Sequence, residues 1–325
     1  MDTRRLQTFV RIVEIGSLTR AADVLHVAQP ALSQQISALE AELGQRLLTR
    51  SKQGVHPTEA GAALYRHAQV ILKQVSDAVA EVGLSGREVA GHVSLGLAPY
   101  SSANLIALPL LRAVRSRYPR IVLRITDNFG AVLSEAMMTG RLDMALLFDS
   151  GPIKGITFER LLTEELVLVC GAGNCPGGGE LAGREQDDVA SLGGEPVGEG
   201  VHGGGSLREV SVGDLADLPM LMTGPTHTIR KAVARACEAS GIELNVVAEL
   251  ESVGLMGQAL AAGLGATLLP ESVAQRVAEQ PGLRILRVTP AIEVHLSLGV
   301  PASLPLSRAA ECVRDLLRQV LAETL

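Results

Sequence analysis

The sequence predicts an N-terminal winged helix-turn-helix, which is all-α with a small wing, then a long linker helix and a C-terminal α/β domain of two subdomains. Residues 17–61 show two short amphipathic helices and a basic hairpin, residues 58–89 show a heptad repeat, and beyond residue 90 apolar strands alternate with helices. With 325 residues, 47% of them hydrophobic, the chain can bury more than one core. We therefore place the domains at 1–60, 58–89 and 90–325.

The two N-terminal helices are predicted from apolar residues that recur every three or four positions. These residues are Leu18, Ala21, Ala22 and Leu25 in the first helix and Leu32, Ile36, Leu39 and Leu43 in the second. With this stripe buried, the second helix turns Pro30, Gln34 and Ser37 outward, with Ser33 on the flank. A helix with small or amide side chains such as Ser and Gln on its exposed face can enter a DNA major groove and form hydrogen bonds to base edges.

A basic hairpin is predicted directly after the second helix. Arg46, Arg50 and Lys52 lie there, and no acidic residue occurs before Glu59. Cations at this place would contact phosphates and hold the helix in register, while the helix selects the sequence. Two packed helices are also common in ordinary bundles, so the hairpin is what favours DNA binding.

A larger set of residues at fixed positions runs through this region. Its members are Phe9, Ile12, Val13, Ser17, Ala21, Ala22, Leu25, Gln29, Pro30, Ala31, Leu32, Ser33, Ile36, Leu39, Glu40, Leu43, Gly44, Leu47, Arg50, Thr58, Glu59, Ala60 and Gly61. In this set the segment resembles the N-terminal domain of LysR-type transcriptional regulators. The resemblance implies a regulator that reads an interrupted palindrome in double-stranded DNA as a homodimer or homotetramer, with RNA polymerase as a further candidate partner.

The resemblance also implies which residues touch DNA. Groove contacts are expected from Gln29, Pro30, Ser33, Gln34 and Ser37, and backbone contacts from Arg50 and Lys52. Family members often have a capping Ser or Thr where this chain has Ala28, and loss of such a cap costs about 1 kcal/mol. They also often have a basic residue at the position of Gln34 or Ser37. Because this chain lacks that residue, we expect fewer direct contacts to guanine than in those members.

The charge of the chain is divided unequally. The net charge is −6, but residues 1–66 hold eight Arg or Lys against six Asp or Glu, whereas residues 90–325 hold nineteen against twenty-six. The N-terminal part is therefore only mildly basic, and DNA binding should depend on a local patch and on two copies acting together.

Cysteine spacing and hydropathy point to a cytoplasmic, reduced protein. Cys170, Cys175, Cys237 and Cys312 show neither paired nor metal-like spacing, so we expect free, buried or incidental thiols and no metal. No secretory signal and no membrane-spanning apolar run is expected.

A dimerisation helix is predicted within residues 58–89. Apolar residues alternate at steps of four and three, namely Leu64, Ala68, Ile71, Val75, Ala78 and Val82. Such a narrow seam favours a partner helix, although a surface helix lying on its own domain is the alternative.

The remaining chain reads as alternating strands and helices. The expected strands are 92–98, 121–126, 143–148, 165–170, 220–223, 245–249, 266–269, 283–288 and 293–300, and the expected helices are 102–118, 131–140, 227–240, 252–262 and 307–323. This order indicates a parallel sheet. The family's effector domain resembles periplasmic solute-binding proteins, which implies subdomain I at 90–163 and 269–325 and subdomain II at 164–268.

Ligands of such sheets bind beyond the strand ends, in the cleft between subdomains. That rule nominates as effector-binding residues Tyr100, Ser101, Ser102, Asn128, Phe129, Phe148, Thr226, His227 and Thr228. For each of the Ser and Thr residues taken singly, an ordinary role as a helix cap is the alternative to effector binding. A small anionic metabolite is the expected effector, because helix N-termini offer free N–H groups to anions.

Two further segments bear on function. The sequences at 108–119 and 140–149 look most like the nitrogen-assimilation-control branch of the family, some of whose members are thought to be governed by abundance rather than by a co-inducer. The Gly-rich, acidic segment 171–205 predicts a long surface loop. A dinucleotide fingerprint there is excluded because Pro176 takes the third glycine position.

No catalytic motif or cofactor-binding motif is found, so we expect no enzyme and no cofactor. The alternative hypothesis is a solute-binding or enzymatic α/β domain whose N-terminal helices only oligomerise.

Overall fold

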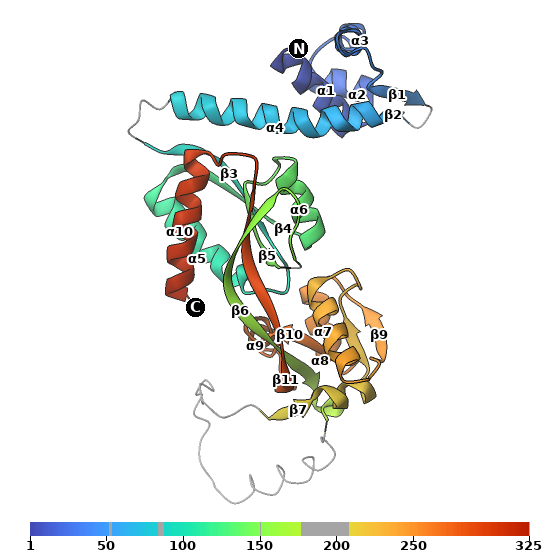
Figure 1. The fold of residues 1–325 in the computed structure, drawn as a ribbon, viewed down its shortest axis with the longest axis vertical. Helices are drawn as coiled ribbons and strands as arrows, with labels where there is room; N and C mark the ends of the chain where they lie inside the picture. Colours follow the sequence, from blue (N-terminus) through green and yellow to red (C-terminus); the bar gives the residue numbers. More distant parts are fainter. Residues whose placement is uncertain (52–53, 84–87, 150, 177–207, 325) are drawn as a thin grey trace, which may run out of the picture.

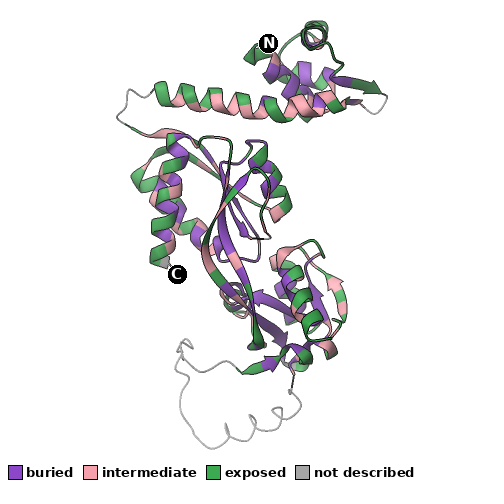
Figure 2. Ribbon diagram, in the orientation of Figure 1, coloured by how far each residue is buried: buried purple, intermediate pink, exposed green. Residues whose placement is uncertain are grey.

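The computed structural model describes residues 1–51, 54–83, 88–149, 151–176 and 208–324. In Figure 1 the N-terminal helices lie at one end of a long helix, and the α/β region extends away from the side of that helix. Buried residues concentrate in the N-terminal bundle and along the central sheet (Figure 2).

The N-terminal domain is a winged helix-turn-helix, as predicted. It consists of α1 (Thr3–Ile15), α2 (Leu18–Leu25), α3 (Gln29–Leu43), β1 (Leu48–Ser51) and β2 (Gly54–Pro57). Asp2 and Ser17 cap the first two helices, whereas α3 begins at Ala28 without a side-chain cap, as the sequence suggested. The stripe Leu32, Ile36 and Leu39 is fully buried, but Leu43 is exposed.

The linker helix α4 (Glu59–Val82) begins at Thr58, whose Oγ accepts a hydrogen bond from Gly61 N and donates one to Arg46 O. Gly61 is required there by close approach, since a Cβ at this position would lie 1.9 Å from Leu47 O. The first half of α4 thereby packs tightly on its own domain.

The C-terminal region contains a nine-stranded sheet flanked by helices. Along the sheet the order is β4-β3-β5-β11-β6-β10-β8-β9, and β7 pairs with β11. The strands are β3 (Ala90–Leu97), β4 (Arg120–Asp127), β5 (Met144–Phe148), β6 (Ile156–Gly171), β7 (Glu209–Ser211), β8 (Met220–Met222), β9 (Val246–Glu249), β10 (Ala266–Pro270) and β11 (Leu283–Pro301). The helices are α5 (Ala103–Arg117), α6 (Gly130–Met138), α7 (Thr228–Ala239), α8 (Val253–Ala261), α9 (Glu271–Val277) and α10 (Arg308–Thr324).

The expectation of a parallel sheet was wrong at the centre of the sheet. Strand β6 is antiparallel to β10 and β11, and β11 is antiparallel to β5. The two strands expected at 283–288 and 293–300 form one long strand, β11, with a register shift between Arg287 and Ile292. Because β6 and β11 pair along almost their whole length, these two strands connect the two subdomains (Figure 1).

Glu164 marks the crossing between subdomains. Its Oε1 accepts hydrogen bonds from Ser102 N at 3.3 Å and from Ser272 Oγ at 3.0 Å. Burial raises the pKa of this carboxyl, although both hydrogen bonds oppose that rise. Glu164 therefore ties the first turn of α9 to the residue that precedes α5.

The cysteine expectation was also wrong in one respect. Cys170 and Cys175 form a disulfide, because a short 3-10 turn after β6 returns the chain and brings their Cα atoms to 5.6 Å. Cys237 and Cys312 are free, as expected. Of the Gly-rich segment, only residues 171–176 belong to the described part of the chain, and the remainder lies outside it.

Candidate DNA-binding surface and effector cleft

The outer face of α3 presents the residues predicted to read DNA. Pro30, Gln34 and Ser37 are exposed. Gln29 and Ser33 are partly buried, and Gln29 Nε2 donates a hydrogen bond to Ser33 Oγ at 3.1 Å. The free polar groups on the most exposed side are therefore the Gln34 amide and the Ser37 hydroxyl.

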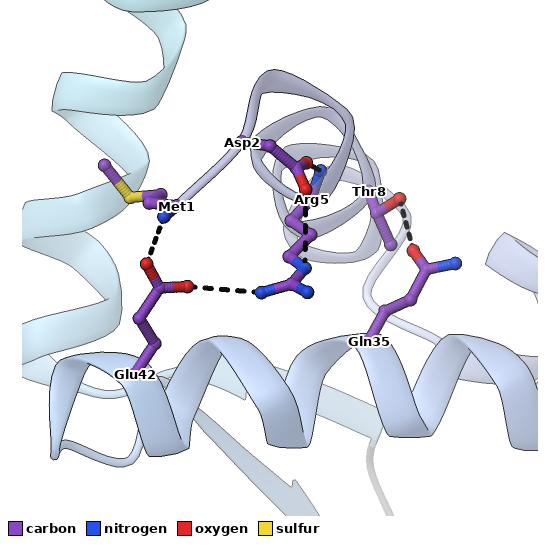
Figure 3. Close-up of polar contacts among 6 residues, drawn as sticks. All are labelled: Met1, Asp2, Arg5, Thr8, Gln35 and Glu42. Atoms are coloured by element: carbon purple, nitrogen blue, oxygen red, sulfur yellow. Dashed lines mark hydrogen bonds and ion pairs between the residues drawn. The ribbon is translucent and has the colours of Figure 1, made fainter.

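Polar contacts with α1 fix the orientation of α3 (Figure 3). Glu42 pairs with the amino group of Met1 and with Arg5 Nη1, the latter at 3.2 Å. Thr8 Oγ1 donates to Gln35 Oε1 at 3.0 Å. These contacts lie on the α1 side of the helix, so the opposite side stays free.

The wing lies beside the exposed face of α3. A hollow of about 530 Å³ is lined by residues of both elements, including Ser37, Glu40, Arg46 and Arg50. Glu40 Oε1 accepts hydrogen bonds from Leu47 N at 2.8 Å and Leu48 N at 3.2 Å, and thereby holds the start of the hairpin against α3. Lys52, predicted to contact phosphate, lies outside the described residues.

The predicted dimerisation seam is divided in two. Ala68 is fully buried in the N-terminal core and Leu64 packs partly against it, so assigning Ala68 to an intermolecular seam was wrong. The reason is that this half of the seam covers α1 of its own domain. The other half is exposed and consists of Ile71 at 37%, Val75 at 42%, Val82 at 83% and Ala78, with Val79 at 68% as a residue that the heptad reading missed.

A cavity of about 490 Å³ lies between the two subdomains and receives residues from both. Five of the predicted effector residues line it, namely Phe129, Phe148, Thr226, His227 and Thr228. Phe129 and His227 meet edge to face, with ring centroids 5.1 Å apart. The convergence of strand ends and helix starts expected from the sequence is therefore present.

Four predicted effector residues do not line this cavity. Tyr100, Ser101 and Ser102 are at most 1% exposed, because the loop after β3 turns inward at Tyr100, whose φ is 59°. Tyr100 Oη donates instead to Leu250 O of the other subdomain at 3.2 Å. Asn128 Oδ1 accepts a hydrogen bond from Phe129 N and thereby stabilises the turn in which it lies.

Residues that sequence reasoning missed complete the cavity. The backbone of Gly130, Ala131 and Val132 contributes the first turn of α6, which has no side-chain cap. Ser134 is 4% exposed, and its hydroxyl has no hydrogen-bond partner in the part of the chain that the structure describes. Lys231 supplies a cation at the rim. Helical spacing from the start of α6 could have suggested Ser134, but no sequence signal distinguishes it from a core serine.

His227 is uncharged at neutral pH. Burial lowers the pKa of its ring to about 4. Its Nδ1 accepts the hydrogen bond from Ile229 N at 3.3 Å, so the neutral ring carries its proton on Nε2. The cavity therefore has a neutral donor at this position, a cation from Lys231 and an acidic side chain from Glu251.

None of the helices in the described part of the chain has the length and apolarity needed to cross a membrane. The described residues also include no cluster of three His, Cys, Asp or Glu side chains suited to a metal ion.

Comparison with known proteins finds two family models. The model described as bacterial regulatory helix-turn-helix protein, lysR family, matches residues 3–62, and the LysR substrate binding domain matches residues 86–198 and 204–322. Together these two models match most of the chain.

Relatives match over the full length. The nitrogen assimilation regulatory protein nac of Escherichia coli (strain K12) is 39% identical over 99% of this chain and 96% of that protein, and its Klebsiella aerogenes counterpart is 36% identical over the same shares. Full-length CbnR complexed with its target DNA has a TM-score of 0.65 at 20% identity, covering 100% of both chains. A full-length OxyR variant from Pseudomonas aeruginosa has a TM-score of 0.69 at 22% identity, covering 99% of this chain and 94% of that one. At these identities the solved structures support the fold alone.

Proposed function

Because the chain belongs to the LysR family of bacterial regulatory helix-turn-helix proteins, and is thus a DNA-binding transcriptional regulator, we propose that it controls genes of nitrogen assimilation. The family and fold predicted from the sequence are confirmed. The alternative, in which the N-terminal helices only oligomerise an enzyme or solute-binding protein, does not hold for a member of this family. The proposal of nitrogen control is supported by two relatives with that name at 39% and 36% identity.

The observation that carries the proposed mode of DNA reading is the exposed face of α3 beside the wing. Gln34 and Ser37 are exposed and polar, which suits hydrogen bonding to base edges in a major groove. Arg50 is an exposed cation on the wing and suits a phosphate contact. We assign sequence selection to α3 and backbone contact to Arg50 and Lys52.

Dimer formation is assigned to the exposed half of the α4 seam. Ile71, Val75, Val79 and Val82 form an apolar face that stays exposed to solvent in the described chain. An apolar helical face of this kind is stabilised by a second copy of the same face, which also matches the two-fold symmetry of a palindrome. The assembled protein is then a homodimer or a pair of dimers.

The inter-subdomain cavity is assigned to a small anionic effector. Free backbone N–H groups at the start of α6, the unpartnered Ser134 hydroxyl and the Lys231 ammonium suit a carboxylate or phosphate. Phe129 and Phe148 suit an apolar remainder of the same molecule. As a DNA-binding regulator the protein acts in the cytoplasm, and RNA polymerase is a candidate partner at the promoter.

The experiment is a DNA selection with full-length protein, followed by footprinting of the selected duplex with and without a panel of small carboxylates and phosphates. We expect a specific footprint over two half-sites and, with the correct anion, a change in footprint length. Ser134→Ala and Lys231→Met should each weaken that response without altering binding of the free protein to DNA. Absence of any selected sequence at moderate salt would contradict sequence-specific reading.

A further inference from the structure

The linker helix contacts the effector domain through a defined set of residues, which we call the linker dock. It comprises Val70, Lys73 and Glu81 on α4 and Gly140, Asp143 and Arg308 on subdomain I. In Figure 1 this part of α4 lies along the end of the subdomain that contains β3, β5 and α6. The dock lies on a different side of α4 from the exposed apolar seam, because positions 70, 73, 77 and 81 share one helical face.

The centre of the linker dock is a desolvated ion pair. Lys73 Nζ lies 2.7 Å from Asp143 Oδ1, and the Asp143 side chain is only 2% exposed. Asp143 Oδ2 accepts a second hydrogen bond from Ser94 N of β3 at 2.7 Å. A buried carboxylate that loses its cation is strongly destabilised, so this contact favours one position of α4.

Two further contacts fix the direction of α4. Glu81 Oε1 accepts a hydrogen bond from Arg308 N, the first residue of α10, at 2.8 Å. At the other end a Cβ built on Gly140 would lie 3.3 Å from Val70 Cγ2, so glycine allows the helix to approach closely. Three contacts spread over three turns thus hold α4 in a single orientation.

Lys73 has a second partner that makes release of the dock feasible. Asp77, one turn along on α4, lies 2.6 Å from Lys73 Nζ. If α4 moves away, Lys73 keeps Asp77 and Asp143 keeps Ser94 N. Release therefore leaves neither group without a polar partner, and the loss of the cation from Asp143 favours the docked position of this two-state element.

The linker dock is also connected to the effector cavity through one short strand. Asp143 immediately precedes β5, and Leu147 and Phe148 at the other end of β5 line the cavity. A shift of β5 on ligand binding would therefore also move Asp143. Here a single packed element reaches both sites.

We propose that the linker dock sets the position of the DNA-binding domain on the effector domain, and thereby the half-site spacing that the assembled protein prefers. This inference rests on the proposed function. Lys73 and Asp143 act as positioning residues, since neither is assigned to the DNA surface or to the cavity wall.

The test measures binding of full-length protein to a series of duplexes, each with the half-sites selected by the wild-type protein but with different spacers. Lys73→Met and Asp143→Asn should each reduce the preference for the best spacer by about fivefold or more, the range of moderate coupling energies. The double variant should lose no more than either single variant, because both changes remove one contact.

Matched controls separate the dock from general charge effects. Arg318→Met breaks an exposed ion pair with Glu159 elsewhere in the effector domain and should keep the spacer preference within about twofold of wild type. Asp77→Asn removes the partner that Lys73 keeps on release, so it should not reduce the preference for the best spacer.

The outcomes are distinguishable. Wild-type spacer preference in both Lys73→Met and Asp143→Asn would overturn the inference, and so would an equal loss of affinity at every spacing. A wild-type protein that selects no duplex at all would instead contradict the proposed function.

Discussion

Among single residues, Glu40 has a structural role near the end of α3, the helix proposed to read DNA. It accepts hydrogen bonds from two consecutive backbone N–H groups at the start of the wing. Glu40→Ala would leave both donors without that acceptor, which costs about 1–3 kcal/mol. We expect faster amide hydrogen exchange at Leu47 and Leu48 and weaker DNA binding. Glu40→Gln keeps an acceptor oxygen and should lose less; equal effects of the two substitutions would argue against this role.

His227 provides a prediction about pH. Its pKa is lowered to about 4, so the folded chain favours the neutral ring. The stability gained from this preference is fully present above the ordinary pKa of 6.5 and is lost as the pH falls from about 6.5 towards about 4. Over that window the loss amounts to about 3 kcal/mol.

The measurement is an NMR titration of the His227 ring, assigned by comparison with His227→Gln. We expect a midpoint near 4 and, in the variant, a shallower loss of stability between pH 6.5 and 4. A midpoint close to 6.5 would mean that the ring is not buried in the cavity wall as described.

Among the secondary-structure elements, the junction between the wing and α4 depends on Gly61. A Cβ there would collide with Leu47 O, a backbone atom whose own hydrogen bond from Thr58 N holds it in place. Gly61→Ala should cost at least about 3 kcal/mol, the upper end for overpacking. Gly44→Ala is the matched control, since Gly44 has a φ of 65° but open space around it, and should cost only about 1 kcal/mol. Urea unfolding followed by circular dichroism compares the two variants; similar midpoints would contradict the steric argument.

The exposed seam of α4 predicts the oligomeric state. A charge at Val75 or Val79 would have to be desolvated between two helices, so Val75→Glu should split the dimer. Ser76→Glu adds the same charge to an exposed position on another side of the helix and should leave the dimer intact. Light scattering after gel filtration gives the mass of each. An unchanged mass for Val75→Glu would show that dimerisation uses another surface.

At the scale of the whole molecule, sequence reasoning succeeded where the signal is local. The Gln-Pro pair and the apolar spacing around α2 and α3 depend on neighbours within a few residues, so the winged helix-turn-helix and most strands and helices were predicted correctly. Sequence reasoning failed where contacts between segments far apart in the sequence determine the structure. Whether Ala68 faces its own α1 or another chain depends on tertiary packing, which spacing along α4 does not reveal.

The cavity illustrates the same limit. Phe129, Phe148 and His227, nominated from strand ends and helix starts, line the cavity, because parallel strands bring their ends together. The inward turn at Tyr100 and the buried hydroxyl of Ser134 depend on how the two subdomains meet. The contact of Lys73 with Asp143 likewise joins residues 70 positions apart in different domains, and no motif in the sequence marks it.

The central claim is that α3 selects DNA sequence while the wing holds the backbone. The most direct measurement is parallel DNA selection, with affinities over a range of salt concentrations, for the wild-type protein, Gln34→Ala and Arg50→Ala. We predict that Gln34→Ala changes which bases are preferred, whereas Arg50→Ala weakens binding to all sequences about equally and lowers the salt dependence by about one counterion per subunit. Unchanged base preferences in Gln34→Ala, together with an unchanged salt dependence in Arg50→Ala, would contradict the account.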